Sequence, residues 1–497
     1  MMSLRKRAFM GMQWNLFGTL ATGILQAAVM VILARVIEPA EFGVLAVAQL
    51  SVAFVLYFSN LGVAPALIRA KELGEGEVRT AFSIAITFSF FLAAALWLFA
   101  PYSVHMMESP RLPGVIRAMG VNFLLTGLGM VSESLLRRQM RFGFLAVIQG
   151  VSYFIGYFIV GIPMALIGYG VWALVAALLV QSAVRTVMQY AGARHSIRLI
   201  WAPKHIKSIL CYGAQHSLAG FLEFLGNSMD RFCVGKFLGA ASLGIYTRGV
   251  SLINLPNQYL GIAITRVLLP GFSEVQKDLE RLRRGYLKGM AACSILMLPF
   301  AMAMTPAARP IISFVLGDRW VDAWPAFIGY GYISWLGLLG TISVTVVDVI
   351  GRQRTKLGIE AVVLPWMITG VLFAISIGSL GRVVLAVSLG YVLRVNLAGA
   401  AVHRLLDTKK MILKTLAGGV YAGLIFMGMV WAAEKYAGSF PVYFWLPGAL
   451  LAGAALIFSG LLLVKIPYVA ELAEIILESY PRVARLPIAV WFFSRIK

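Results

Sequence analysis

Charged residues are scarce in this chain. Asp, Glu, Lys and Arg make up 13% of its 497 residues, whereas they make up about 25% of an ordinary globular domain. Hydrophobic residues make up 60%, and the mean hydropathy is +0.84. A soluble fold of this size would lack the polar residues needed to cover its surface. The composition therefore excludes soluble globular, disordered and collagen-like chains, and it predicts an all-α integral membrane protein.

Acidic residues are scarcer than basic ones. The chain has 21 Asp and Glu against 43 Lys and Arg, which gives a formal net charge of +22. Such an excess is typical either of nucleic-acid binding or of cations gathered in the cytoplasmic loops of a membrane protein. The positions of the cations along the chain decide between these two classes.

Cysteines are few, and familiar catalytic signatures are missing. Cys211, Cys233 and Cys293 lie in apolar surroundings without CxxC spacing, which favours small buried side chains over a disulfide framework or a zinc site. The sequence has no Walker A, HExxH or GxSxG motif. Of five scattered histidines, only His216 lies well inside an apolar run. We therefore expect no catalytic residue, no metal site and no cofactor.

Apolar runs of about 20 residues, the length that crosses a bilayer, recur along the chain. We predict fourteen membrane spans, over residues 12–34, 43–66, 80–104, 114–136, 143–165, 171–192, 208–230, 243–265, 285–305, 324–348, 357–380, 383–402, 414–433 and 443–464. The loops between them are too short for a soluble catalytic domain. In the tail, residues 466–497, apolar and charged residues recur at helical spacing, which predicts an amphipathic helix along the cytoplasmic membrane surface.

The cations follow the alternation of the predicted loops. Most of them, with Arg137 and Arg185 counted here, lie at the N-terminus or in loops that follow even-numbered spans, and few lie in odd-numbered loops. Cytoplasmic loops carry such an excess, so both termini are predicted to be cytoplasmic. The excess then serves orientation and contact with anionic lipid headgroups, and nucleic acid is rejected as a partner.

A short segment of the chain recurs about 200 residues later. Residues 33–45, LARVIEPAEFGVL, align with residues 234–246, VGKFLGAASLGIY, at an offset of 201, which pairs Arg35 with Lys236 and Gly43 with Gly244. Each segment links two spans on the same predicted face, so spans 1–2 correspond to spans 7–8. Such a repeat predicts two halves related by an axis along the membrane normal, as in transporters with a site between their halves. Chance likeness of apolar sequence is the alternative interpretation.

The first of these segments also carries a resemblance to a known family. Residues 33–43 are similar to the first-loop signature of the polysaccharide transport family, bacterial flippases of lipid-linked oligosaccharides in the multidrug/oligosaccharidyl-lipid/polysaccharide exporter superfamily. Further similar segments follow in the expected order, over residues 135–142, 168–175, 229–248, 266–270 and 317–320. The resemblance covers residues 10–355, and beyond it only the hydropathy matches.

The resemblance implies a fold and a function. The fold would comprise two six-helix lobes around a central cavity, residues 1–207 and 208–410, followed by two helices in 411–465 and the tail 466–497. The function would be alternating-access export of an undecaprenyl-pyrophosphate-linked repeat unit of an exopolysaccharide, capsule or O-antigen across the bacterial inner membrane. A polysaccharide polymerase and chain-length or export proteins are the implied partners, together with membrane lipids.

Three other functions compete with this one. A multidrug antiporter of the same superfamily usually has twelve spans and an acidic residue in the first, but residues 12–34 contain no Asp or Glu. A lipid II flippase also has fourteen spans, but the segments quoted above fit it less well. A membrane polysaccharide polymerase or ligase normally has a large extracytoplasmic loop, and no odd-numbered loop here exceeds about twenty residues.

Cations inside the spans are the leading candidates for substrate binding, because charge within the membrane is costly and usually functional. We predict that Arg248 and Arg117 bind the pyrophosphate, since the guanidinium fork matches phosphate oxygens, and Arg394 is a third candidate. Arg117 lies near the start of its span, so snorkelling to the interface is an alternative. Pairing with a structural acid is the alternative for Arg394.

A polar stripe on span 7 is the second candidate feature. Glu223, Asn227, Asp230 and Arg231 follow at helical spacing, and Gln26 aligns with Asn227 under the offset of 201. We expect Glu223, Asn227 and Gln26 to line the cavity. Asp230 and Arg231 are placed with the two repeat segments as a structural or gating motif, and a helix-end role is their alternative.

Three further acids lie within or beside spans. Glu133, Asp348 and Glu360 could each carry a proton during transport, but ordinary interfacial exposure is the expectation for Glu133 and Asp348. The sequence identifies no coupling ion.

Overall fold

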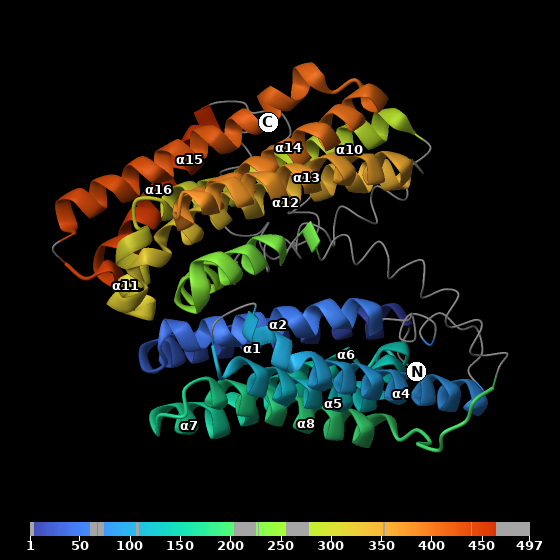
Figure 1. The fold of residues 1–497 in the computed structure, drawn as a ribbon. Helices are drawn as coiled ribbons and strands as arrows, with labels where there is room; N and C mark the ends of the chain where they lie inside the picture. Colours follow the sequence, from blue (N-terminus) through green and yellow to red (C-terminus); the bar gives the residue numbers. More distant parts are fainter. Residues whose placement is uncertain are drawn as a thin grey trace. The chain divides into compact units, whose positions relative to one another are not determined.

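The computed structural model describes residues 4–59, 67, 74–105, 109–202, 225–226, 228–254, 278–350, 353–438 and 440–463. Within these ranges the regular elements are all helices (Figure 1), and no strand occurs. The chain divides into two compact units, residues 1–247 and 248–497.

Unit 1 is a bundle of long apolar helices. Its helical elements are α1 (Leu4–Val36), α2 (Pro39–Ser59), α4 (Glu75–Phe99), η1 (Ala100–His105), α5 (Leu112–Arg138), α6 (Phe142–Tyr153), η2 (Phe154–Gly161), α7 (Ile162–Leu166) and α8 (Val171–Ala193). The stretch η2 is a π-helix that joins α6 to α7, and α5 packs against both α4 and α8. Small residues allow close packing: a Cβ on Gly156 of η2 would lie 2.5 Å from the carbonyl oxygen of Ala177 in α8.

Polar side chains tie the loops of unit 1 together at its two ends. At one end, Arg141 donates from Nη1 to the carbonyl oxygen of Gly192 at 2.8 Å. At the other end, the Glu41 carboxylate accepts the backbone N–H of Val171 at 2.9 Å and forms an ion pair with Arg111. Loops that follow even-numbered spans thus meet at one end of the unit, and loops that follow odd-numbered spans meet at the other.

Unit 2 is a second helical bundle. Its helical elements beyond residue 278 are α10 (Leu279–Met304), α11 (Ala308–Leu316), η3 (Asp318–Ala323), α12 (Trp324–Val349), α13 (Gln353–Ser376), α14 (Leu380–Leu406), α15 (Lys409–Ala437) and α16 (Val442–Leu463). α10 packs against α12 and α15, and α14 packs against α12 and α13. Their buried core includes Tyr286, whose hydroxyl lies 3.1 Å from the hydroxyl of Ser343. Residues 228–254 cross the boundary between the two units and are helical, with Gly239, in unit 1, at a φ of +83°.

The described helices follow the predicted spans closely. Nine of them are long and apolar enough to cross a membrane, and shorter apolar helical stretches cover residues 21–36, 39–53 and 442–453. Most of the predicted span 208–230, residues 255–265 of the predicted span 243–265, the boundary at 207/208 and the tail 466–497 lie outside the described residues.

One connection between predicted spans contains two short helices. Residues 306–323 link the predicted spans 285–305 and 324–348, and they include α11 and η3. α11 is amphipathic, because Ala308, Ile312 and Leu316 recur every fourth residue and are all buried. Its nine residues are too few to cross a bilayer, so a search for long apolar runs passes over it. Gly317, with φ of +101°, ends the helix.

Candidate functional site

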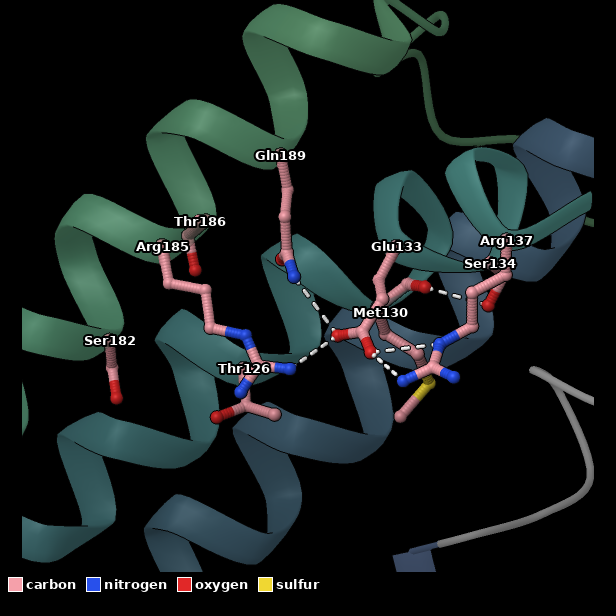
Figure 2. A pocket seen from close by; sticks show the side chains of 9 residues that line it. All are labelled: Thr126, Met130, Glu133, Ser134, Arg137, Ser182, Arg185, Thr186 and Gln189. Atoms are coloured by element: carbon pink, nitrogen blue, oxygen red, sulfur yellow. Dashed lines mark hydrogen bonds and ion pairs between the residues drawn. The ribbon is translucent and has the colours of Figure 1, made fainter. Parts of the chain in front are cut away.

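A polar pocket lies between α5 and α8 in unit 1 (Figure 2). Its volume is about 220 Å³, and the lining side chains are Thr126, Met130, Glu133, Ser134 and Arg137 from α5 and Ser182, Arg185, Thr186 and Gln189 from α8. On each helix the lining positions recur at steps of three and four residues, which brings them onto one face. The pocket is therefore a facing pair of polar stripes on two otherwise apolar helices.

A glycine allows the two stripes to approach. A Cβ on Gly129 of α5 would lie 2.6 Å from Oε1 of Gln189 and 3.1 Å from the hydroxyl oxygen of Thr186. Both distances are shorter than an ordinary carbon contact of about 3.5–4.0 Å. Any larger residue at this position would force the side chains of Gln189 and Thr186 to shift.

The Glu133 carboxylate is the common acceptor of the hydrogen bonds in the pocket that come from arginine and glutamine side chains. Its Oε1 accepts hydrogen bonds from Arg137 Nε at 3.0 Å and Arg137 Nη2 at 2.7 Å, and its Oε2 accepts from Arg185 Nη2 at 2.8 Å and Gln189 Nε2 at 3.0 Å. Figure 2 shows these groups converging on the carboxylate from both helices. Two guanidinium groups share one carboxylate, so these three side chains carry a net positive charge.

The hydroxyl groups of the pocket are oriented by the backbone. Thr126 donates to the carbonyl of Asn122, Ser134 to that of Met130, and Thr186 to that of Leu125, each at 2.7–2.8 Å. Since each proton is used in this way, these oxygens can only accept hydrogen bonds from a molecule in the pocket. The walls therefore combine cationic donors with neutral acceptors.

The pocket was only partly foreseen from the sequence. Arg185 was counted among the loop cations, but it lies inside α8 and pairs with Glu133. Glu133 was expected to be exposed at the interface, yet its side chain is only 21% exposed and is paired with two arginines. The sequence contained an indication of this ion pair, because Glu133 and Arg185 carry opposite charges and both fall within predicted spans, 114–136 and 171–192.

The cations predicted to bind pyrophosphate lie elsewhere. Arg117 of α5 is half-buried, with its Nε 3.5 Å from the carbonyl oxygen of Trp97 and its guanidinium 4.6 Å from the Trp97 ring. Arg394 of α14 forms a 2.8 Å ion pair with Glu360 of α13, which is the pairing given above as its alternative. Arg248 is half-buried in the helical segment 228–254.

The two repeat segments meet backbone to backbone within unit 1. A Cβ on Gly43 of α2 would overlap the carbonyl oxygen of Ala240, and a Cβ on Gly244 would overlap the carbonyl oxygen of Pro39. The offset of 201 relates Pro39 to Ala240 and Gly43 to Gly244. The contact is therefore reciprocal, like that of an isologous interface, and we call it the glycine contact.

The remaining predicted residues of the repeat segments are placed around this contact. Buried Tyr246 donates its hydroxyl to Oδ2 of buried Asp230 at 2.6 Å, which joins the helices on either side of Gly239. Arg35 and Lys236 are exposed. Arg231 and, on α1, Gln26 are half-buried, whereas Glu223 and Asn227 lie outside the described residues.

Comparison with known proteins identifies the family. The chain belongs to the polysaccharide biosynthesis protein family, whose model matches residues 32–325. It is 27% identical over 315 residues to the succinoglycan biosynthesis transport protein ExoT of Rhizobium meliloti (strain 1021), with 63% of each chain covered. The matched region thus spans less than two thirds of that relative. The family predicted from the repeat segment and the later motifs is confirmed.

Solved structures identify the fold. The chain resembles a structure of the lipid II flippase MurJ in an inward closed conformation, with a TM-score of 0.71, 14% identity and coverage of 89% of this chain and 96% of that one. It also resembles an inward-facing multidrug transporter of the MOP superfamily, with a TM-score of 0.59, 13% identity and coverage of 80% and 99%. At these identities the likeness shows the fold alone. The chain is an all-helical, multi-pass membrane protein with the fold of this superfamily.

Proposed function

We propose that this chain exports an undecaprenyl-pyrophosphate-linked oligosaccharide repeat unit across the bacterial inner membrane by alternating access. The polymer would be an exopolysaccharide, a capsule or an O-antigen. The family assignment supports this proposal, as does a relative named as a succinoglycan biosynthesis transport protein. In this proposal both termini are cytoplasmic, and transport involves no covalent chemistry. A polymerase and export proteins then act on the exported repeat unit.

The observation that carries the proposal is the charged pocket between α5 and α8. Both helices are long and apolar enough to cross a membrane, and a charged group facing lipid there would be strongly unfavourable. The stripe of Glu133, Arg137 and Arg185 lines a polar pocket between the two helices, and we infer that this pocket is open to water rather than to lipid. Such a space gives a polar, anionic headgroup a favourable environment while its lipid tail stays in the bilayer.

In this proposal the glycine contact closes the extracytoplasmic side of the protein. Its two segments include the first and seventh predicted loops, which both lie on the extracytoplasmic side in the predicted topology. In the proposed mechanism this contact joins the halves 1–207 and 208–410 when the extracytoplasmic side is closed. Opening that side separates Gly43 from Ala240 and Gly244 from Pro39, the two approaches that the side chain of any larger residue would prevent.

The experiment that tests the function is deletion of the gene followed by analysis of surface polymers and lipid-linked intermediates. We expect loss of one polymer and accumulation of its lipid-linked repeat unit in the cytoplasmic leaflet. A polymerase or ligase would instead leave the unit in the extracytoplasmic leaflet, where an added glycosidase reaches it in spheroplasts. Intact export of every surface polymer would overturn the proposal.

A further inference from the structure

We propose that the pocket between α5 and α8 is a phosphate-binding site with room for an adjoining sugar, in which Arg137 and Arg185 exchange the Glu133 carboxylate for a phosphate group of the ligand. This inference rests on the proposed function and names the part of the chain that holds the charged end of the lipid-linked sugar.

The Glu133 carboxylate marks where an oxyanion binds. It accepts two N–H groups from Arg137 and one from Arg185, and each guanidinium has five N–H donors. Carboxylate and phosphate oxygens fit the same planar fork. A phosphate that reached the pocket would find two cations already directed at one point.

The hydroxyl groups favour a sugar beside that phosphate. The oxygens of Thr126, Ser134 and Thr186 present acceptors to the pocket, because their protons are donated to the backbone. Sugar hydroxyl groups can donate to these acceptors, whereas a bare phosphate has little to offer them. A volume of about 220 Å³ corresponds to about seven waters at roughly 30 Å³ each. That is room for a phosphate and an adjoining sugar, so the rest of an oligosaccharide must lie outside.

Glu133 limits how tightly the ligand binds. The side chains of Arg137 and Arg185 are 51% and 39% exposed, so both can turn toward a ligand, while Gln189 still donates to the carboxylate. The released carboxylate then lies near the phosphate and repels it. A transporter benefits from this repulsion, because the ligand must leave again after translocation.

The test measures binding by the full-length protein in nanodiscs. Isothermal titration calorimetry with inorganic pyrophosphate and with farnesyl pyrophosphate supplies the two probes. We expect Glu133→Gln to bind about tenfold more tightly, since it removes the competing charge, and Arg185→Gln to bind at least tenfold more weakly. Arg185→Lys keeps the charge without the fork and should fall between wild type and Arg185→Gln.

A matched ion pair provides the control. Glu75 and Arg79 form an i,i+4 pair on α4 outside the pocket, so Glu75→Gln and Arg79→Gln should leave binding unchanged. Thermal unfolding of each variant checks that it is folded. A Glu133→Gln variant that binds no more tightly than wild type would overturn the inference, because a merely structural Glu133 predicts no gain in affinity.

The two probes distinguish the source of the phosphate. Equal binding of both supports a site for phosphate alone, and binding of farnesyl pyrophosphate only supports a site reached by a lipid carrier. Binding of neither probe overturns the site. The function is tested separately: if deletion blocks export but the pocket variants bind like wild type, the site fails and the transport function stands.

Discussion

Substitution of Gly43 by alanine tests whether the glycine contact opens during transport. The added methyl group would overlap the carbonyl oxygen of Ala240 and lie 2.5 Å from its carbonyl carbon, whereas carbon atoms rest about 3.5–4.0 Å apart. Both partners are backbone, so neither can turn away. Overpacking of this kind is unfavourable by about 1–3 kcal/mol. That energy would lower the ratio of closed to open molecules about 5- to 150-fold.

The assay is a distance measurement between the two repeat segments. Arg35 and Lys236 are exposed and equivalent under the offset of 201, so spin labels at both should not disturb the packing. With the native cysteines replaced by serine, pulsed electron paramagnetic resonance would report the distribution of label separations. We expect Gly43→Ala to enlarge the long-distance population and to slow export in complemented cells.

A second glycine provides a control for the general effect of replacing a helical glycine by alanine. Gly76 on α4 has no heavy atom within 4 Å of the position its Cβ would take, so Gly76→Ala should leave both the distances and export unchanged. If Gly43→Ala gave the wild-type distance distribution and normal export, the contact would not be the closure that opens. Loss of export with unchanged distances would also refute the reasoning, since the defect would lie elsewhere.

Three further substitutions test the surrounding structure. Gly244→Ala should cause the same shift in label separation, and substitution of both glycines should add little, because the second change acts on a contact already opened. Tyr246→Phe removes the hydroxyl donor to buried Asp230 and should lower the free energy of unfolding by about 1–3 kcal/mol in denaturant titrations. Glu41→Ala removes an acceptor from the first N–H of α8 and should destabilise by about 0.5–2 kcal/mol, whereas exposed Glu38 provides the control Glu38→Ala in thermal unfolding.

The fold was predictable because the membrane sets one dominant rule. Every crossing helix needs about 20 apolar residues, so run length alone located helices such as α8 and α14 to within a few residues. The short helix α11 obeys a different rule, burial of one amphipathic face, and was missed. The polar pairings were not predictable, because apolar run length does not report how two neighbouring helices are rotated. Arg394 was therefore found, but its contact with Glu360 was not.

Arg185 and Arg394 together show how the two halves differ. Arg185 lies fourteen residues after Val171, the first residue of α8, and Arg394 lies fourteen residues after Leu380, the first residue of α14. These helices are the sixth and twelfth predicted spans, so each carries one arginine at the same distance from its first residue.

The partners of these two arginines are different. Arg185 reaches Glu133 on α5 in a pocket shared with a second arginine, whereas Arg394 reaches Glu360 on α13, is only 16% exposed and lies 5.2 Å from the ring of Tyr391. Arg185 is therefore the one placed to meet a ligand, and Arg394 the one placed to hold two helices together. Arg394→Gln should reduce stability, measured by thermal unfolding, more than Arg185→Gln does, while only Arg185→Gln should weaken pyrophosphate binding. The reverse pattern would assign the ligand to unit 2.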